Sequence, residues 1–390
     1  MNRSFIILLA AVSALGPMAM QIFVPSLPWI QKAFQVSTAE AQLTLSLSLI
    51  AIAVATLAFG PLSDRYGRRP VLLAGFGIFL AGSLMCVFAP TIWTLITGRI
   101  VQAAGGAAGL VLSRAIIRDM CCSVDAARII ATVSMGMVCA PMMAPAIGGV
   151  LQDLFDWRAT FVFSGAVSLL LLVMIKRRLR ETNVRPVAFT GVWHMIKVFG
   201  TLLRSPAFSG YAFHTACSSV IFFTFVSCTP YVMADLMNRP ATEYGLYFIM
   251  ISVGFMFGNF TTSRLCTTLG INRMIMIGTG FSVAGLLCAY GFIVAGGLTP
   301  LRLFASVGVA IVGNGMSMPN TQAAAINAFP QIAGSASGLT GFLQMFFAAL
   351  ATQLVALLYD GTPFPMIYLM ITASVLSMVS FSVAMRWGRQ

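Results

Sequence analysis

The sequence contains little charge, and acidic side chains are especially scarce. Only 8% of its 390 residues are charged, with 10 Asp and Glu against 23 Lys and Arg. Soluble domains carry about 25% charged residues, and a soluble chain of this length needs far more polar surface to cover its core. The scarcity of charge therefore excludes an ordinary soluble protein.

Metal-binding and catalytic patterns are also missing. The 8 cysteines are scattered, mostly in apolar runs, and they form no CxxC pair and no Cys/His cluster with metal-ligand spacing. The chain has no phosphate-binding GxxxxGK[ST] loop and no GxSxG elbow. We therefore expect no metal site, no cofactor, no ATP hydrolysis within this chain and no enzymatic activity.

Long apolar runs take the place of charge, since 59% of the residues are hydrophobic. A membrane-spanning helix needs roughly 20 such residues, and this rule predicts an all-α polytopic membrane protein with about twelve transmembrane helices. The first run continues to Ile30, so we interpret it as an uncleaved helix and not as a signal peptide. The predicted spans are residues 5–29, 40–62, 70–89, 92–116, 126–150, 157–176, 207–234, 242–265, 272–295, 298–319, 330–357 and 363–386.

The net charge of +13 follows the predicted topology. If the N-terminus lies in the cytoplasm, most Lys and Arg residues fall in cytoplasmic loops, as the positive-inside rule requires. The outer loops then contain Lys32, Arg158, Arg239 and Arg302. We expect a multi-pass protein of a bacterial inner membrane with both termini in the cytoplasm. Its partner is the lipid bilayer, and nucleic acid is not needed to explain the charge.

One loop is long, and it divides the chain at its midpoint. We expect a six-helix half at 1–176, a cytoplasmic linker at 177–206 and a second six-helix half at 207–390. The linker begins with a basic run and continues as an amphipathic segment. We expect this segment to lie on the membrane surface, with Trp193 and Phe199 toward lipid and Lys197 toward phosphates.

A weak internal repeat supports two halves. GPLSDRYGRRP follows the second predicted span, and SRLCTTLGINR follows the eighth, so that Gly67 corresponds to Gly270. The acid and arginine of the first copy, Asp64 and Arg65, are replaced by Thr267 and Thr268 in the second. Two such halves with a binding site at the membrane midplane between them form a known transporter architecture.

The GPLSDRYGRRP segment resembles the signature of the major facilitator superfamily between its second and third helices. The resemblance implies the major facilitator fold and a conformational latch that holds the two halves together in one state. Asp119, near the end of the fourth span, resembles the acid that completes the latch. The alternative is that these charges only direct topology. The implied latch residues are Gly60, Asp64, Arg65, Gly67, Arg68, Arg69 and Asp119.

The fourth span contains GRIVQAAGGAAG, which resembles the family's second motif at Arg99 and Gln102. An arginine inside the membrane costs at least about 2.5–3.5 kcal/mol and rarely faces lipid. We expect Arg99 to face the central cavity, where it holds substrate or influences proton transfer. The alternative is an arginine that reaches the outer surface.

The fifth span carries AxxxAPxxGG, which resembles the family's antiporter motif with alanines in place of two glycines. In the family this motif marks exporters that exchange substrate for protons. The alternative is close helix packing, which small residues also permit. The motif residues are Ala140, Pro141, Ala144, Pro145, Gly148 and Gly149.

Four further segments, FVPSLPWI, WRATFVF, TPYVMADLM and PNTQAAAINAFPQIAGSASGLTGFLQ, resemble the Bcr/CflA drug-resistance branch of the family. The chain departs from that branch at Gln21, which stands where an acid is expected. No acid lies in the middle of a predicted span. His214 is the only histidine in a span and is the candidate for proton coupling, although we favour a packing role for it. Asp119 and Asp235 are the alternative titrating groups, and uncoupled transport or another ion gradient is the alternative to protons.

These residues together define the expected substrate. A cavity with an arginine and glutamines but no carboxylate should favour neutral or anionic amphipathic molecules over organic cations. Hydrogen bonding between helices is the alternative role for the polar members. The candidate cavity residues are Gln21, Arg99, Gln102, Phe222, Asn314 and Gln344.

The resemblance implies a secondary active transporter that exports drugs or other amphipathic molecules by alternating access, with protons as the exchanged ion. A first alternative is an exporter or uncoupled facilitator of one metabolite, siderophore or lipid-like compound. A second is a membrane receptor or sensor that transports nothing, which has little use for a latch. The family default is a monomer, and we expect one here.

Overall fold

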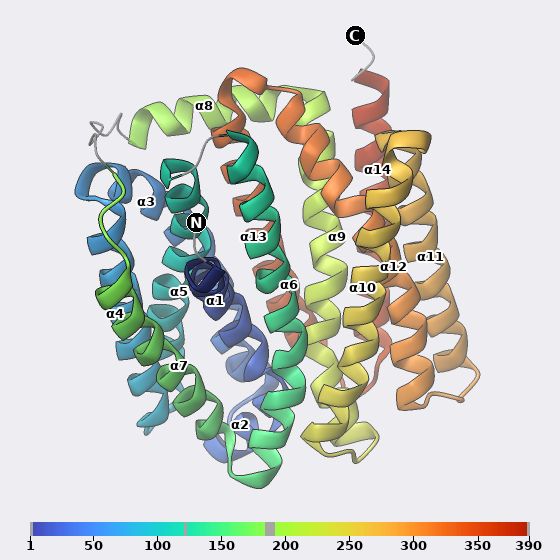
Figure 1. The fold of residues 1–390 in the computed structure, drawn as a ribbon. Coiled ribbons are helices and arrows are strands. Elements are labelled where there is room, and N and C mark those ends of the chain that lie inside the picture. Colours follow the sequence, from blue (N-terminus) through green and yellow to red (C-terminus); the bar gives the residue numbers. More distant parts are fainter. Residues whose placement is uncertain (1–2, 121–122, 184–191, 388–390) are drawn as a thin grey trace. The chain divides into compact units, whose positions relative to one another are not determined.

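The computed structural model describes residues 3–120, 123–183 and 192–387, which form helices joined by short connections (Figure 1). In this part of the chain, twelve helices are long and apolar enough to cross a membrane. The predicted all-α fold with twelve spans is confirmed. The helices pack into two units, which comprise Met1–Phe189 with Pro240–Gly245, and Thr190–Arg239 with Leu246–Gln390.

The first unit contains six spans. Its elements are α1 (Arg3–Ile22), the short turn η1 (Val24–Ser26), α2 (Leu27–Phe34), α3 (Thr38–Tyr66), α4 (Arg68–Val87), α5 (Ile92–Met120), α6 (Ser123–Leu154) and α7 (Trp157–Arg178). The first predicted span is interrupted, because α1 ends at Ile22 and α2 begins at Leu27. Pro25 and Pro28 in this stretch have no backbone N–H to continue the helical ladder.

The second unit begins with the linker helix. Its elements are α8 (Val192–Arg204), α9 (Pro206–Tyr231), the turn η2 (Val232–Leu236), α10 (Ala241–Leu269), α11 (Ile271–Val294), α12 (Pro300–Asn327), the turn η3 (Pro330–Ile332), α13 (Ala333–Leu358) and α14 (Phe364–Trp387). The first turn of α10 packs with the first unit, and the rest of α10 packs with the second.

Several helices begin at residues that satisfy their first N–H groups. The Ser37 side chain accepts from the Glu40 N–H while the Glu40 carboxylate accepts from the Ser37 N–H, a capping box at the start of α3. Ser205 caps α9 and Thr299 caps α12, each followed by a proline that has no N–H to satisfy.

Both units use the same packing scheme. In the first unit α4 packs on α5 and α7, and α1 packs on α5, α6 and α7. In the second, α11 packs on α12 and α14, and α9 packs on α12, α13 and α14. The helices α1, α4, α5, α6 and α7 thus have counterparts six spans later. Gly67 and Gly270 hold equivalent places, since each begins a helix with a positive φ, +97° and +82°.

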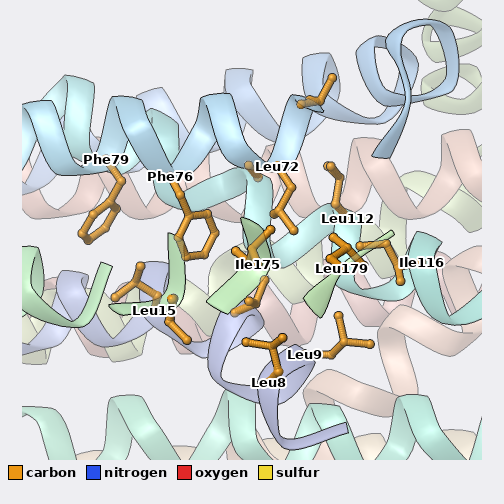
Figure 2. Packing of buried hydrophobic residues seen from close by; sticks show 14 of the residues in the cluster. Leu8, Leu9, Leu15, Leu72, Phe76, Phe79, Leu112, Ile116, Ile175 and Leu179 are labelled. Carbon is orange, nitrogen blue, oxygen red and sulfur yellow. The ribbon is translucent and has the colours of Figure 1, made fainter. Parts of the chain in front are cut away.

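The core of the first unit lies between α1, α4, α5 and α7. Figure 2 shows side chains from these helices converging, and the residues labelled there are Leu8, Leu9, Leu15, Leu72, Phe76, Phe79, Leu112, Ile116, Ile175 and Leu179. Because lipid is as apolar as leucine, such a core is held by close packing and not by exclusion from water. Its fit therefore positions the helix ends that carry the polar groups.

The predicted amphipathic helix exists as α8, but one of its expected contacts is wrong. Phe199 packs with Val198 against a buried cluster of the second unit that includes Leu202, Phe208 and Ala212. α8 lies at the ends of α9 and α13, and these helices provide a protein partner for its apolar face (Figure 1). Phe199 therefore packs at least in part on protein, where the sequence predicted lipid. Lys197 is exposed, and the Trp193 side chain lies outside the described part.

Candidate functional site

Arg68 is the centre of a charge cluster formed by Asp64, Arg68 and Asp119. Its Nη1 lies 2.6 Å from the Asp64 Oδ1, and its Nε donates to the Asp119 Oδ2 at 2.9 Å. The Ser63 hydroxyl accepts from Nη1 at 2.6 Å. Only 9% of Arg68 is exposed, whereas the Asp64 and Asp119 side chains are 46% and 23% exposed. One buried cation thus bridges two carboxylates that water can reach.

The turn between α3 and α4 makes this arrangement. α3 ends at Tyr66, Gly67 reverses the chain at φ +97°, and α4 begins at Arg68. A side chain at that φ is strained, so glycine is suited to the turn. Asp119 arrives from the last turn of α5. The structure therefore brings together four of the predicted latch residues, Asp64, Gly67, Arg68 and Asp119.

The other predicted latch residues lie outside the charge cluster. Arg65 stacks on the Tyr66 ring, with its guanidinium carbon 5.1 Å from the ring centre. The Arg69 Nη2 donates to the Lys176 carbonyl at 3.1 Å and ties the turn to the end of α7. Gly60 lies inside α3, and no described atom comes within 4 Å of a Cβ placed there. Among the described residues, neither Arg65 nor Arg69 forms a recorded ion pair with Asp64 or Asp119.

Sequence reasoning missed Glu181, which lies on the same turn. Its carboxylate accepts from the backbone N–H groups of Arg68 at 2.8 Å and Arg69 at 3.0 Å, and also from those of Thr182 and Asn183. Partial burial raises the pKa of Glu181, but these four donors outweigh it and hold the pKa below its usual value. The available signal was a lone acid directly after the basic end of α7.

Arg99 lies in α5 and is only 1% exposed. Its Nη1 donates to the Gln102 Oε1 at 2.6 Å and to the Ala19 carbonyl at 3.2 Å. The guanidinium carbon is 3.8 Å from the centre of the Phe23 ring and 5.8 Å from that of Phe161. These partners are all neutral, and the contacts recorded for the guanidinium in the described residues include no carboxylate.

Of the two glutamines predicted to line the cavity, Gln102 bonds to Arg99, and Gln21 lies on α1, the helix that also supplies Ala19. The Gln102 Nε2 donates to the Ser83 hydroxyl at 2.9 Å, so the amide links α5 to α4. Gln21 is 7% exposed at the end of α1, and its Oε1 has no hydrogen-bond partner among the described residues. A buried acceptor without a donor costs about 1–3 kcal/mol. It is therefore a candidate for a bond to a bound molecule.

The small residues around Arg99 allow neighbouring helices to approach α5. A Cβ at Gly105 would lie 2.5 Å from the Gly75 carbonyl oxygen of α4. A Cβ at Gly109 would overlap the Val12 carbonyl oxygen of α1. The glycines of this motif thus place α1 and α4 directly against the helix that carries Arg99.

The antiporter-motif residues lie in α6. Ala144, Pro145, Gly148 and Gly149 are buried, while Ala140 and Pro141 are partly exposed. A Cβ at Gly148 would overlap the Ile22 carbonyl oxygen at the end of α1. Close contact explains Gly148 within the first unit. It leaves the antiporter assignment as a prediction.

The predicted cavity residues of the second unit have partners within that unit. The buried Asn314 Nδ2 donates to the Ser218 carbonyl at 3.0 Å, and the Ser282 hydroxyl donates to its Oδ1 at 3.3 Å. The partly buried Gln344 Oε1 accepts from the Gln322 Nε2 at 3.2 Å. Phe222, also partly buried, packs edge-to-face on Phe223 and Phe248.

His214 belongs to α9, and its side chain packs against α14. Its Nδ1 is 2.9 Å from the Ser377 carbonyl oxygen, and its ring packs edge-to-face on Phe381. Because a carbonyl only accepts, Nδ1 carries the hydrogen. Nε2 is buried without a hydrogen-bond partner in the described part of the chain. The geometry is that of a packing histidine with one free acceptor nitrogen. No group of three or more potential metal ligands occurs among the described residues.

Known proteins resemble this chain over nearly its whole length. The family model described as Major Facilitator Superfamily matches residues 9–352. The Bicyclomycin resistance protein homolog of Haemophilus influenzae is 28% identical, covering 97% of this chain and 95% of that protein. Multidrug resistance protein D of Escherichia coli is 26% identical, covering 92% and 89%.

A solved structure resembles the fold. A bacterial homolog of the human lysosomal transporter Spinster, in an inward-facing and unoccupied conformation, aligns with a TM-score of 0.75. The alignment covers 99% of this chain and 98% of that one, at 16% sequence identity. At this identity the likeness concerns the fold alone.

Proposed function

Because the chain belongs to the Major Facilitator Superfamily, a family of transporters, we propose that it exports amphipathic small molecules or drugs by alternating access, in exchange for protons. The names of its relatives, a bicyclomycin resistance protein homolog and a multidrug resistance protein, support drug export and agree with the Bcr/CflA branch. The observation that carries the proposal is the charge cluster of Asp64, Arg68 and Asp119.

The charge cluster has the properties of a latch that can open. Both carboxylates of the cluster remain partly exposed, so opening the ion pairs leaves no fully buried acid without a partner. Water can therefore solvate Asp64 and Asp119 when they separate from Arg68. Arg68 is buried at the start of α4, where it can receive the two carboxylates again after each cycle.

The substrate class follows from the charges around Arg99. A buried guanidinium whose partners are neutral attracts anions and repels cations. The Gln21 Oε1, at the end of α1, has no partner among the described residues and offers an acceptor to a hydroxyl or amide of the substrate. Aromatic rings of Phe23 and Phe161 add apolar surface beside the charge. These features together favour neutral or anionic amphipathic substrates.

Proton coupling needs a titrating group, and Gln21 cannot titrate. His214 remains the candidate, with its free Nε2 as the atom that would take the proton. Its packing against Ser377 and Phe381 favours a structural role instead. The alternative function is therefore an exporter or uncoupled facilitator of one metabolite, siderophore or lipid-like compound.

The orientation and assembly complete the proposal. The basic end of α7, at Lys176, Arg177 and Arg178, belongs on the cytoplasmic side by the positive-inside rule. The charge cluster lies on this same cytoplasmic side. We propose that both termini also lie in the cytoplasm and that the protein is in the inner membrane of a bacterial cell. The working form is a monomer with two six-helix halves, 1–176 and 207–390, joined by a linker at 177–206.

Proton flux in proteoliposomes tests this function directly. The purified protein is reconstituted with a pH dye inside, and neutral, anionic and cationic drugs are added in turn. We expect proton movement with neutral or anionic drugs. His214→Ala then tests whether the histidine carries the proton, because its loss should abolish the pH signal and leave drug binding intact. Drug movement without protons would replace the antiporter assignment with the uncoupled alternative.

A second measurement tests the substrate class. Saturable transport of a quaternary ammonium dye that is lost in Gln21→Ala would contradict the preference for neutral and anionic molecules. Arg68→Ala serves as the control for the latch, because it should lower the transport rate of every substrate equally.

A further inference from the structure

The first residues of the linker, Glu181, Thr182 and Asn183, lie on the turn between α3 and α4. The chain leaves α7 at Arg178, and Leu179 then enters the core of the first unit, where it is 4% exposed. Figure 2 shows Leu179 beside Ile116 and Leu112 of α5. This buried leucine directs the following residues toward the start of α4.

Glu181 satisfies donors from two segments at once. Its Oε1 accepts from the Arg68 N–H at 2.8 Å and from Thr182 and Asn183, each at 2.9 Å. Its Oε2 accepts from the Arg69 N–H at 3.0 Å. The first N–H groups of a helix have no partner inside that helix, and a negative charge is favoured there. Glu181 thus supplies from the linker what α4 lacks in its own sequence.

Asn183 and Thr182 reach the other helix end and the charge cluster. The Asn183 Nδ2 donates to the Asp64 carbonyl at 2.8 Å and to the Ser63 carbonyl at 3.3 Å, in the last turn of α3. The Thr182 hydroxyl donates to the Asp119 Oδ2 at 3.4 Å, the oxygen that also accepts from Arg68. Three consecutive linker residues therefore contact the end of α3, the start of α4 and the end of α5.

The turn is shaped to receive the carboxylate. A Cβ at Gly67 would lie 2.6 Å from the Glu181 Oε2, so a larger residue would displace the Glu181 carboxylate from the turn. Gly270 has the same role at the start of α11 and a similar φ, +82°, but no described atom lies within 4 Å of a Cβ placed there. Both glycines have a positive φ, at which any other residue would be strained, but only Gly67 has a carboxylate beside it among the described atoms.

We propose that Glu181, Thr182 and Asn183 form a clasp that fastens the start of the linker to the α3–α4 turn and positions Arg68 between Asp64 and Asp119. The clasp makes the linker a part of the transport machinery and not only a connection. These three are positioning residues, since they act through Arg68. The structural part of this proposal stands without the proposed function, which enters only through the transport readout below.

Trypsin cleavage measures the clasp without any substrate. The sites after Arg177, Arg178 and Arg180 directly precede it. In the purified full-length protein we expect Gly67→Ala to raise the cleavage rate there about tenfold, because proteolysis follows the population of the opened segment. Gly270→Ala is the matched control, with the same strain, and should cleave like the native protein. Both substitutions leave the linker sequence unchanged.

Asn183→Ala provides a second variant in case Gly67→Ala does not fold. It removes the bonds to α3 without altering the turn, and faster cleavage is again expected. Equal cleavage rates for Gly67→Ala, Gly270→Ala and the native protein would overturn the clasp, whether or not the protein transports drugs.

Transport kinetics test the positioning role. Asn183→Ala should lower the maximal transport rate severalfold and leave KM unchanged, because it disturbs the charge cluster and not the substrate contacts. The double variant Gly67→Ala with Glu181→Ala should lose less than the product of the two single losses, because the carboxylate that meets the added methyl group is then absent. Losses that multiply in the double variant would overturn the role of Glu181, while absence of transport in the native protein would refute only the proposed function.

Discussion

Replacement of Arg99 separates its structural role from its role in transport. The guanidinium makes two hydrogen bonds to oxygen atoms, those of Gln102 and Ala19, and a weak third one to the Met20 Sδ, and it stacks on Phe23. Hydrogen bonds to a charged group contribute about 1.5–3 kcal/mol each, and a desolvated cation–π contact about 2 kcal/mol. The favourable contacts therefore total about 5–8 kcal/mol, against a desolvation penalty that is itself several kcal/mol.

Arg99→Met removes both the favourable contacts of the guanidinium and the penalty for burying its charge. The contacts are lost and Gln102 keeps an acceptor without a donor, but no charge has to be buried. We expect the free energy of unfolding to change by less than about 2 kcal/mol. Arg99→Lys keeps the buried charge and loses the planar fork and most of the stacking, so we expect it to be destabilised by about 2–4 kcal/mol. The chemically closer substitution should be the more damaging one for stability.

Thermal unfolding in detergent, followed with a dye that fluoresces on reacting with thiols, measures this order. The buried free cysteines Cys86, Cys217 and Cys228 become reactive only when the protein opens. Arg158→Lys and Arg158→Met are the controls, because Arg158 stacks on Trp157 at 4.1 Å but is exposed. Their Tm values should match that of the native protein. If Arg99→Lys is as stable as Arg99→Met, the burial argument is wrong. Both Arg99 variants should lose transport.

Three further predictions follow from other contacts. Partial burial raises the pKa of Glu181, but its backbone donors have the larger effect and hold the pKa below the usual value. The stabilisation that Glu181 gives the clasp is therefore complete above the usual pKa and is lost as pH falls through the lowered value. Hydrogen exchange at the start of the linker, corrected for intrinsic rates, should stay slow from pH 8 to about 5. Gly148→Ala places a methyl group on the Ile22 carbonyl and should lower Tm strongly, whereas Gly77→Ala, which meets no described atom within 4 Å, should not. His214→Phe should fold and transport drugs if the histidine only packs, and an abolished proton flux with intact drug binding would show that it couples.

The sequence predicted the fold well because membrane spans are set locally. A hydrocarbon layer about 30 Å thick requires roughly 20 apolar residues per helix, and this demand is visible in any one segment. The breaks were less predictable. α1 ends at Ile22, although the apolar run continues to Ile30, because Pro25 and Pro28 disrupt the ladder that apolarity would allow. The face of α8 was also misassigned, since lipid and a buried protein surface are equally apolar partners for Phe199.

From the sequence, the family resemblance of GPLSDRYGRRP and of the acid near the end of the fourth span predicted that Asp64, Arg68 and Asp119 belong to one charge cluster. Only the tertiary structure decided that Glu181, more than a hundred residues later, accepts hydrogen bonds from the main-chain N–H groups of the α3–α4 turn. Every residue except proline has such an N–H, so the sequence pattern does not show which acid will bind it. The tertiary structure also decided that Arg99 is enclosed by Phe23 and Gln102. A helix has four free N–H groups at its start whatever its residues are, so the acid that satisfies them can come from any distance along the chain.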